Sequence, residues 1–174
     1  YRNNGRVWCR QAEEVNEHDF PDAAECRAVP FGIYDVTSNA GDVMVGTAHD
    51  PPDFAVHAIA RGWEEEGRAV YPSAEQLLIL ADGGGSNGAR VRAWKRNLQA
   101  KVSDQFGSTV MVCHSPPGCS KWNPIERRLF SHISHNWAGV PLRTWNTLLA
   151  FIRGTTTAAG LTVHAEPVPD GEAA

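Results

Sequence analysis

Two acidic residues stand where side chains of an α/β protein commonly meet a ligand. Asp82 follows the most apolar run of the chain, residues 77–81, and Glu126 opens a later helical segment. A strand-end aspartate and a helix-borne glutamate form a pair suited to phosphodiester chemistry, because hard cations such as Mg²⁺ prefer carboxylate oxygens. The third acid that such a site needs is not evident from the pattern.

Each acid also has a purely structural explanation. Asp82 precedes a glycine-rich stretch, residues 83–88, where a carboxylate often accepts hydrogen bonds from turn amides. Asn123 and Pro124 favour a helix start, with Glu126 placed to close a capping box at the third helical position. The capping and ligand roles of Glu126 are compatible, since the helical spacing also places it at the border of the apolar stripe.

The glycine-rich stretch also fits a second kind of site. Gly83, Gly85 and Gly88 match the G-x-G-x-x-G pattern of dinucleotide-binding loops, between a predicted strand and a predicted helix. Against this, the pattern lies in mid-chain behind a hairpin, and the helix that follows is strongly basic. We therefore favour the acidic site over a nucleotide cofactor site.

Composition bounds the class of protein. The 174 residues fit one domain, and 42% hydrophobic with 21% charged residues is typical of a globular chain. No apolar run approaches the ~20 residues of a membrane span, and no basic-then-apolar leader is present, so we expect a cytoplasmic protein without a membrane contact. The four cysteines include no C-x-x-C pair, which favours free thiols over a zinc site.

The net charge of −4 hides a strong asymmetry. Residues 1–85 carry 6 Lys/Arg and 15 Asp/Glu, a net of −9, whereas residues 86–164 carry 10 and 2, a net of +8. A segment at +8 is a suitable footprint for a polyanion such as DNA. The alternative is a basic half that is neutralised by packing against the acidic half.

Hydrophobic periodicity predicts an α/β domain in which a hairpin feeds a mixed sheet flanked by helices. The run 77–81 shows no alternation, which predicts a strand covered on both faces, and 109–113 is also predicted as a buried strand. In chain order the predicted elements are strands 28–37 and 43–47, a helix over 50–67, strand 77–81, a helix over 89–102, strand 109–113, and helices over 124–137 and 142–153.

Three strings carry a resemblance to a known family: LLILADGGGSNG, VCHSPPGCSKWNPIERRLFSHISHNW and FGIYDVTSNAGDVMVG. They resemble the Rhodopirellula-type transposase DDE domain of bacterial insertion sequences, which is related to mariner-like transposases. The resemblance implies a ribonuclease-H-like fold over residues 1–165, followed by a flexible acidic tail at 166–174. It also implies the activity of a DNA transposase, which cleaves DNA and transfers strands.

The resemblance places residues in roles. Asp82 matches the family's second aspartate and Glu126 its glutamate, so both are expected to be catalytic and to hold a pair of Mg²⁺ or Mn²⁺ ions. The expected partner is double-stranded DNA, both transposon ends and target, and a homo-oligomer is left open. Basic side chains are expected to contact phosphates: Arg90, Arg92, Lys95, Arg96, Lys121, Arg127 and Arg128.

The sequence departs from the family pattern at the first aspartate. In a ribonuclease-H-like sheet this residue lies on the first strand, ahead of the hairpin, and the resemblance places that strand before Tyr1. Asp35 is the one good internal substitute for the third carboxylate, because it lies on the predicted strand 28–37, although that strand resembles the second strand of such a sheet. We expect an amino-terminally truncated domain whose activity suffers from the missing acid. The alternative is a non-catalytic nucleic-acid-binding module that uses the basic segment 89–128.

Overall fold

Five strands divide into two sheets in the computed structural model, which describes residues 3–15, 27–47, 52–116 and 118–168. The strands are β1 (Val29–Asp35), β2 (Ala40–Gly46), β3 (Gln76–Ala81), β4 (Thr109–His114) and β5 (Thr162–Pro167). The helices are α1 (Pro52–Gly62), α2 (Arg68–Val70), α3 (Arg92–Leu98), α4 (Asp104–Phe106), α5 (Ser131–Asn136) and α6 (Trp145–Arg153). Short π-helical or 3₁₀ turns extend or join them: η2 (Trp63–Gly67), η3 (Gly85–Asn87), η4 (Gln99–Ser103), η5 (Ser120–Trp122) and η6 (Glu126–Phe130).

The first sheet contains β1, β2 and β5. β1 and β2 form the predicted antiparallel hairpin, and Asn39 adopts a left-handed conformation in its turn (φ 56°), where its side chain accepts a hydrogen bond from the Tyr34 hydroxyl at 2.7 Å. β5 was not predicted from the sequence. It pairs parallel to β2 and continues to Pro167, and Val168 N–H still donates to Val45 O at 3.0 Å. The sheet therefore extends past the predicted domain limit at residue 165.

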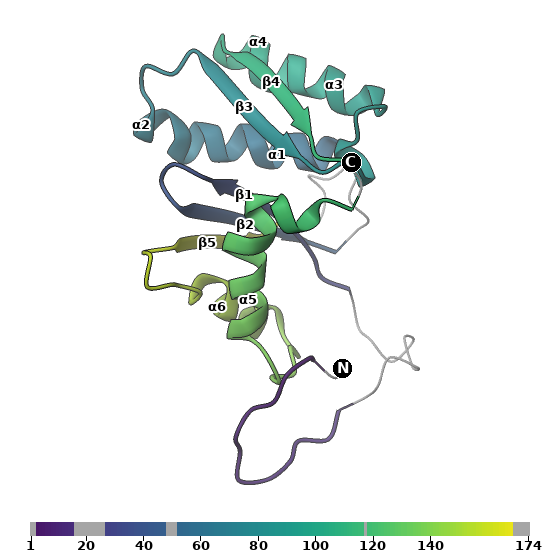
Figure 1. Cartoon of the computed structure of the whole chain (residues 1–174), viewed down its shortest axis with the longest axis vertical. Helices are drawn as coiled ribbons and strands as arrows, with labels where there is room; N and C mark the ends of the chain where they lie inside the picture. Colours follow the sequence, from purple (N-terminus) through teal and green to yellow (C-terminus); the bar gives the residue numbers. More distant parts are fainter. Residues whose placement is uncertain (1–2, 16–26, 48–51, 117, 169–174) are drawn as a thin grey trace.

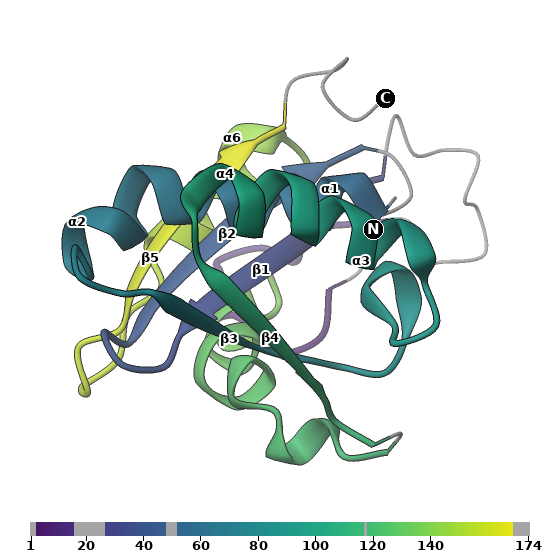
Figure 2. The ribbon, with the colours of Figure 1, turned by 90° about the horizontal axis from the view of Figure 1, so that it is seen from above.

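The second sheet contains β3 and β4, which run parallel and are joined by the helical stretch 92–106. Figure 2 shows α1, α3 and α4 on the same side of this pair. The prediction that β3 and β4 are covered on both faces was wrong. Leu78 and Leu80 are 58% and 49% exposed and Met111 is 58% exposed, because the helices of the described chain pack against the opposite face only.

Helix α1 packs against both sheets. Phe54 and Ala58 pack with Met44 of β2, and the Phe54 ring meets Phe31 of β1 edge-to-face at 5.7 Å between centroids. The neighbouring Ala55 and Val56, both fully buried, belong to the core cluster that also contains Trp94 of α3 and the inner face of β3 and β4. Figure 1 shows the consequence, with α1 running beside both β3 and β1.

The helix that begins with Glu126 packs on the three-stranded sheet together with α6. Leu129 and Ile133 join Leu149 and Ile152 in one buried cluster over β2 and β5. Two glycines of the hairpin allow this close approach. A Cβ at Gly41 would lie 2.5 Å from Leu129 Cδ1, and a Cβ at Gly32 would lie 2.6 Å from Phe130 Cζ.

In the described ranges no helix is long and apolar enough to cross a bilayer. The described amino-terminal residues lie along the turn after α5. Asn3 donates its side-chain amide to Trp137 O at 3.0 Å, and Gly139 N–H donates to Asn4 O at 2.7 Å. These bonds hold residues 3–5 close to the carboxyl end of the Glu126-bearing helix.

Replacing Gly41 with Ala tests whether this close contact positions the helix. The added methyl group would collide with Leu129, which is fully buried, so we expect the unfolding free energy to fall by about 1–3 kcal/mol. Urea denaturation followed by circular dichroism measures the change. Gly46→Ala is the matched control on the same strand, since its nearest neighbour would be Phe54 Cζ at 3.8 Å. Equal stability of the two variants would contradict the packing described.

Candidate functional site

Asp82 lies immediately after β3, at the carboxyl end of the parallel pair, where open α/β sheets place ligands. Its side chain is exposed. The adjacent strand end is close, because Ser115 N–H donates to Ala81 O at 2.8 Å. Among the described residues no backbone N–H donates to the Asp82 carboxylate, whose hydrogen-bond partner is the side chain of Asn87 in the same turn.

Asn87 holds the Asp82 side chain and was missed by the sequence reasoning. With its amide nitrogen facing the two oxygens, Asn87 donates to Asp82 Oδ1 at 3.0 Å and to Gly84 O at 2.6 Å. His114, at the end of β4, fixes the same turn through Nε2, which lies 2.8 Å from Asn87 O. An asparagine within a glycine-rich loop after a strand-end acid is the signal that would have identified this contact.

Glu126 opens η6 with its carboxylate exposed. The predicted capping box is absent in the described part of the chain, where Glu126 makes neither a hydrogen bond nor an ion pair. The Glu126 carboxylate therefore does not cap the amino end of its own helix. Asn123, three residues earlier, is by contrast only 8% exposed.

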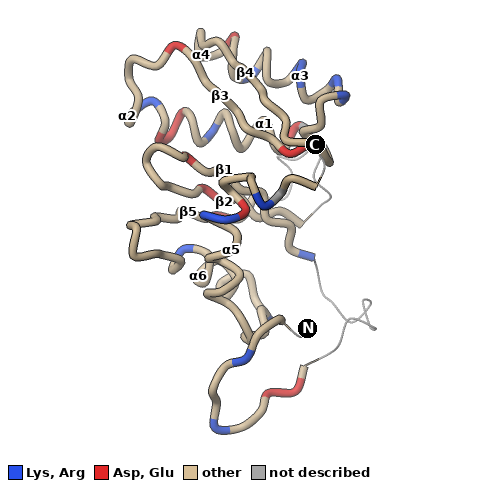
Figure 3. The backbone as a smooth tube through the Cα atoms, in the orientation of Figure 1, with Lys and Arg blue, Asp and Glu red and all other residues tan. Residues whose placement is uncertain are grey.

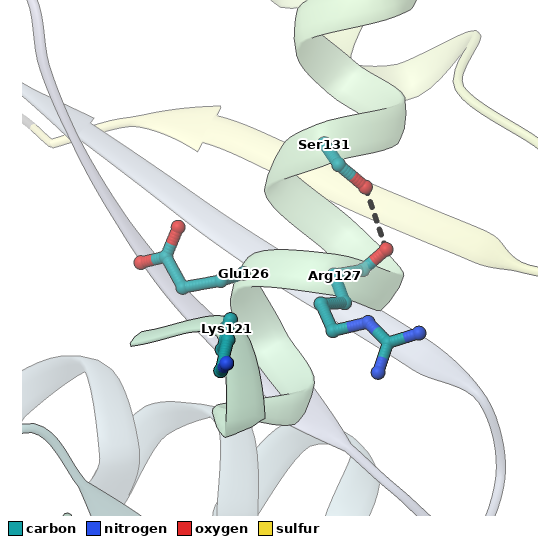
Figure 4. Close-up of a pocket in the computed structure, with 4 residues that line it drawn as sticks. All are labelled: Lys121, Glu126, Arg127 and Ser131. Carbon is teal, nitrogen blue, oxygen red and sulfur yellow. Dashed lines mark hydrogen bonds between the residues drawn. The ribbon is translucent and has the colours of Figure 1, made fainter. Parts of the chain in front are cut away.

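An open hollow of about 390 Å³ adjoins Glu126, lined by Lys121, Glu126, Arg127 and Ser131. Figure 4 shows the Glu126 carboxylate and the Arg127 guanidinium pointing away from each other. The Ser131 hydroxyl donates to the Arg127 carbonyl oxygen, which closes the helical turn rather than binding the acid. The Glu126 carboxylate is thus available to a cation or a ligand.

Asp35 lies elsewhere. It caps the hairpin turn, accepting hydrogen bonds from Thr37 N–H at 2.8 Å and Ser38 N–H at 3.2 Å, and from the Tyr71 hydroxyl at 2.7 Å. Tyr71 precedes the start of β3, whereas Asp82 follows its end, and a six-residue strand spans roughly 20 Å. The structure therefore does not bring Asp35 together with Asp82.

The basic side chains predicted to meet DNA are all exposed. Within the described ranges none of them makes an ion pair, although Lys101 on the same helical stretch reaches Asp53 at 3.5 Å. Figure 3 shows Lys and Arg positions in blue on α3 and on the stretch that leads into α5. Within the described ranges the seven predicted DNA contacts thus stay unpaired, whereas Lys101 and Arg143 of the basic half pair with Asp53 and Glu13 of the acidic half. The residues are Arg90, Arg92, Lys95, Arg96, Lys121, Arg127 and Arg128.

The carboxylates of Asp82 and Glu126 are the type of ligand that a hard cation binds, but these two acids alone do not form a complete metal site. Asp82 and Glu126 offer exposed oxygen ligands of the type that Mg²⁺ binds. The described residues, however, contain no group of three or more His, Cys, Asp or Glu side chains arranged to hold a metal ion. Cys113 and Cys119 are free thiols.

The fold and the site together define a mixed α/β domain with exposed acids at the ends of its elements and several unpaired basic side chains. This combination is suited to binding a nucleic acid. The chain belongs to the family of the Rhodopirellula transposase DDE domain, whose model matches residues 1–173. This confirms the family predicted from the sequence motifs. No curated protein and no solved structure gives a match.

The environment of Asp35 predicts a pH-dependent stability contribution. Burial raises the pKa of Asp35, but hydrogen bonds from Tyr71, Ser38 and Thr37 outweigh it and hold the pKa below the usual 3.8. A lowered native pKa stabilises the fold above the unfolded-state value, and this stability is lost as pH falls through the native pKa. Tyr71→Phe should therefore cost about 1 kcal/mol near neutral pH and less near pH 3.

Urea denaturation at both pH values measures the difference. Tyr34→Phe is the control, because it removes a hydrogen bond to the uncharged Asn39 and should cost the same at both. A Tyr71→Phe effect that does not vary with pH would contradict the assignment.

Proposed function

We propose that this chain is the catalytic domain of a DNA transposase that cleaves DNA and joins strands. Membership of the transposase DDE family implies a transposase catalytic role. The observation that supports a catalytic use of this chain is the pair of exposed acids, Asp82 and Glu126, neither of which makes an ion pair in the described residues. Exposed acids without an ion pair contribute little to stability, which favours a ligand-binding role.

In the proposed reaction, the oxygen of a water molecule or of a DNA 3′-hydroxyl forms a new bond to phosphorus as the bond to the 3′-oxygen of the DNA breaks. Bound Mg²⁺ or Mn²⁺ would activate the attacking oxygen and stabilise the leaving one. Asp82 and Glu126 would hold those ions as ionised carboxylates. Asn87 would keep Asp82 in position through its side-chain amide.

We further propose that the domain is ribonuclease-H-like and that one more strand completes its sheet. β1 pairs only with β2, and β3 pairs only with β4, so the facing edges of β1 and β3 carry unpaired backbone groups within the described residues. In Figure 1 these two strands are the nearest members of the two sheets. A strand between them would join both sheets, and it would be the place for the third carboxylate.

The exposed basic residues of α3, η5 and η6 would contact DNA phosphates. Arg92 and Arg96 are four residues apart on α3 and therefore share one face, while Trp94 and Leu98 are buried on the other. Such contacts position a duplex without reading its sequence. Double-stranded DNA is accordingly the proposed partner, and a homo-oligomer remains an expectation.

A non-catalytic nucleic-acid-binding module is the second candidate. It is favoured by one observation, the absence of a three-carboxylate group from the described residues. Such a module would bind DNA through the basic segment and would show no dependence on the two acids.

Removing either acid tests the catalytic proposal. We expect Asp82→Asn and Glu126→Gln each to abolish weak Mn²⁺ binding. In electron paramagnetic resonance, the wild-type chain should reduce the free Mn²⁺ signal and each variant should leave it unchanged. Each should also reduce metal-dependent DNA nicking by at least about a hundredfold. Asp104→Asn is the matched control, since Asp104 is an exposed acid near the opposite end of the β3–β4 pair. Undiminished Mn²⁺ binding in both variants would contradict the site.

Removing charge from α3 tests the DNA-binding proposal. Arg92→Gln and Arg96→Gln should each lower the slope of log K against log salt concentration by about 0.9, the value expected for one lost phosphate contact. Fluorescence anisotropy over a salt series gives the slopes. Arg143→Gln removes a charge that is already paired with Glu13 at 2.8 Å, so it should leave the slope unchanged. Equal slopes for all three variants would exclude this face.

A further inference from the structure

The Trp122 side chain is largely exposed to solvent, and the fold does not require this exposure. Its residue is 68% exposed, whereas Trp94 is almost fully buried and the other described tryptophans of the helices are partly covered. Exposing an indole to water forfeits a large hydrophobic contribution, since aromatic side chains bury about 150–250 Å² each when packed. An aromatic ring that is exposed to solvent beside a candidate site is suited to bind a ligand that also has an aromatic face.

The Trp122 ring stands on an ordered turn. Its backbone N–H donates to Cys119 O at 2.9 Å, and Cys119 N–H donates to Pro116 O at 3.2 Å. The next residue, Asn123, is buried and leads directly into the helix that carries Glu126. The turn that presents the ring, η5, also contacts η6. The ring is therefore held at a defined place next to the acid rather than on a free loop.

The surroundings of the ring favour a nucleotide over an apolar partner. Lys121 Nζ lies 5.3 Å from the Trp122 ring centroid, and both Lys121 and Arg127 line the hollow beside Glu126. A cation next to an exposed aromatic face is the pairing by which proteins bind unpaired nucleotides, the cation meeting the phosphate and the ring stacking on the base. An apolar protein partner would instead bury these charges at a cost.

We propose that Trp122 stacks on one unpaired nucleobase of the DNA next to the phosphate that Glu126 serves. This inference rests on the proposed function and deepens it, because it names a binding site for a base that has left the duplex. An enzyme that extracts a base pays to unstack it, and an aromatic face that accepts the base recovers part of that free energy. Trp122 would thus favour DNA that is already distorted at the cleavage position.

The test compares a paired duplex with the same duplex carrying one unpaired 2-aminopurine, without divalent metal. The wild-type chain should bind the unpaired form roughly tenfold more tightly, within the range of one base–aromatic stack, and should quench the 2-aminopurine fluorescence. Trp122→Ala should lose both the preference and the quenching while binding the paired duplex as before. Trp122→Phe should retain most of the preference, because it keeps an aromatic face.

Trp8→Ala is the matched control, since Trp8 is also fully exposed but lies in the amino-terminal segment. Circular dichroism of each variant checks that the fold is intact, as expected for an exposed side chain. A preference and quenching that persist in Trp122→Ala would overturn this inference and leave the proposed function standing. Failure of the wild-type chain to bind either DNA would overturn both.

Discussion

The arrangement of the site depends on helix α1, which is packed against both sheets at once. Phe54 and Ala58 lie on the hairpin sheet, while Ala55 and Val56 lie in the core of the β3–β4 sheet. Arg61, at its carboxyl end, forms an ion pair with Glu166 of β5 and so ties the helix to the far strand as well. Asp82 follows a strand of one sheet, and Glu126 begins a helix packed on the other. In the described chain no backbone hydrogen bond joins the two sheets. The relative position of the sheets is therefore set by the dense side-chain packing around α1 and not by a continuous sheet.

This constraint explains why the two acids are held by such different means. Asp82 is fixed locally, by Asn87 and by a turn that His114 supports. Glu126 is fixed through its helix, whose buried residue Leu129 meets Gly41 of the hairpin. Lys121 and Arg127 line the hollow beside Glu126 and make no ion pair in the described ranges, and such uncompensated charge attracts a polyanion and repels cations. In the proposed reaction, the phosphates of bound DNA would neutralise this charge and so favour metal binding by the two acids.

Much of this organisation was readable in the sequence, and the exceptions have identifiable causes. The hairpin, the strand before Asp82 and the helix at Glu126 follow from turn residues, an apolar run and a helix-start signal. The burial of β3 was misjudged because a run such as 77–81 gives no information on how many faces are covered; Leu78 and Leu80 are exposed. β5 was missed because its inward residues are only Val163 and Ala165, too weak an alternation to recognise. The last helix begins at Trp145, later than predicted, since Thr144 accepts a hydrogen bond from Thr147 N–H as its N-cap. Asn87 was missed because the asparagine of the glycine-rich loop was not considered as a partner of the strand-end acid.

The central proposal is that Asp82 and Glu126, held by different sheets, serve the same metal ions. The most direct measurement is anomalous X-ray scattering from crystals of the chain with DNA and Mn²⁺. The account predicts an anomalous peak at coordinating distance from carboxylate oxygens of both residues, roughly 2.0–2.3 Å for a small divalent cation. A peak bound to one acid alone, or at any site that excludes both, would contradict it.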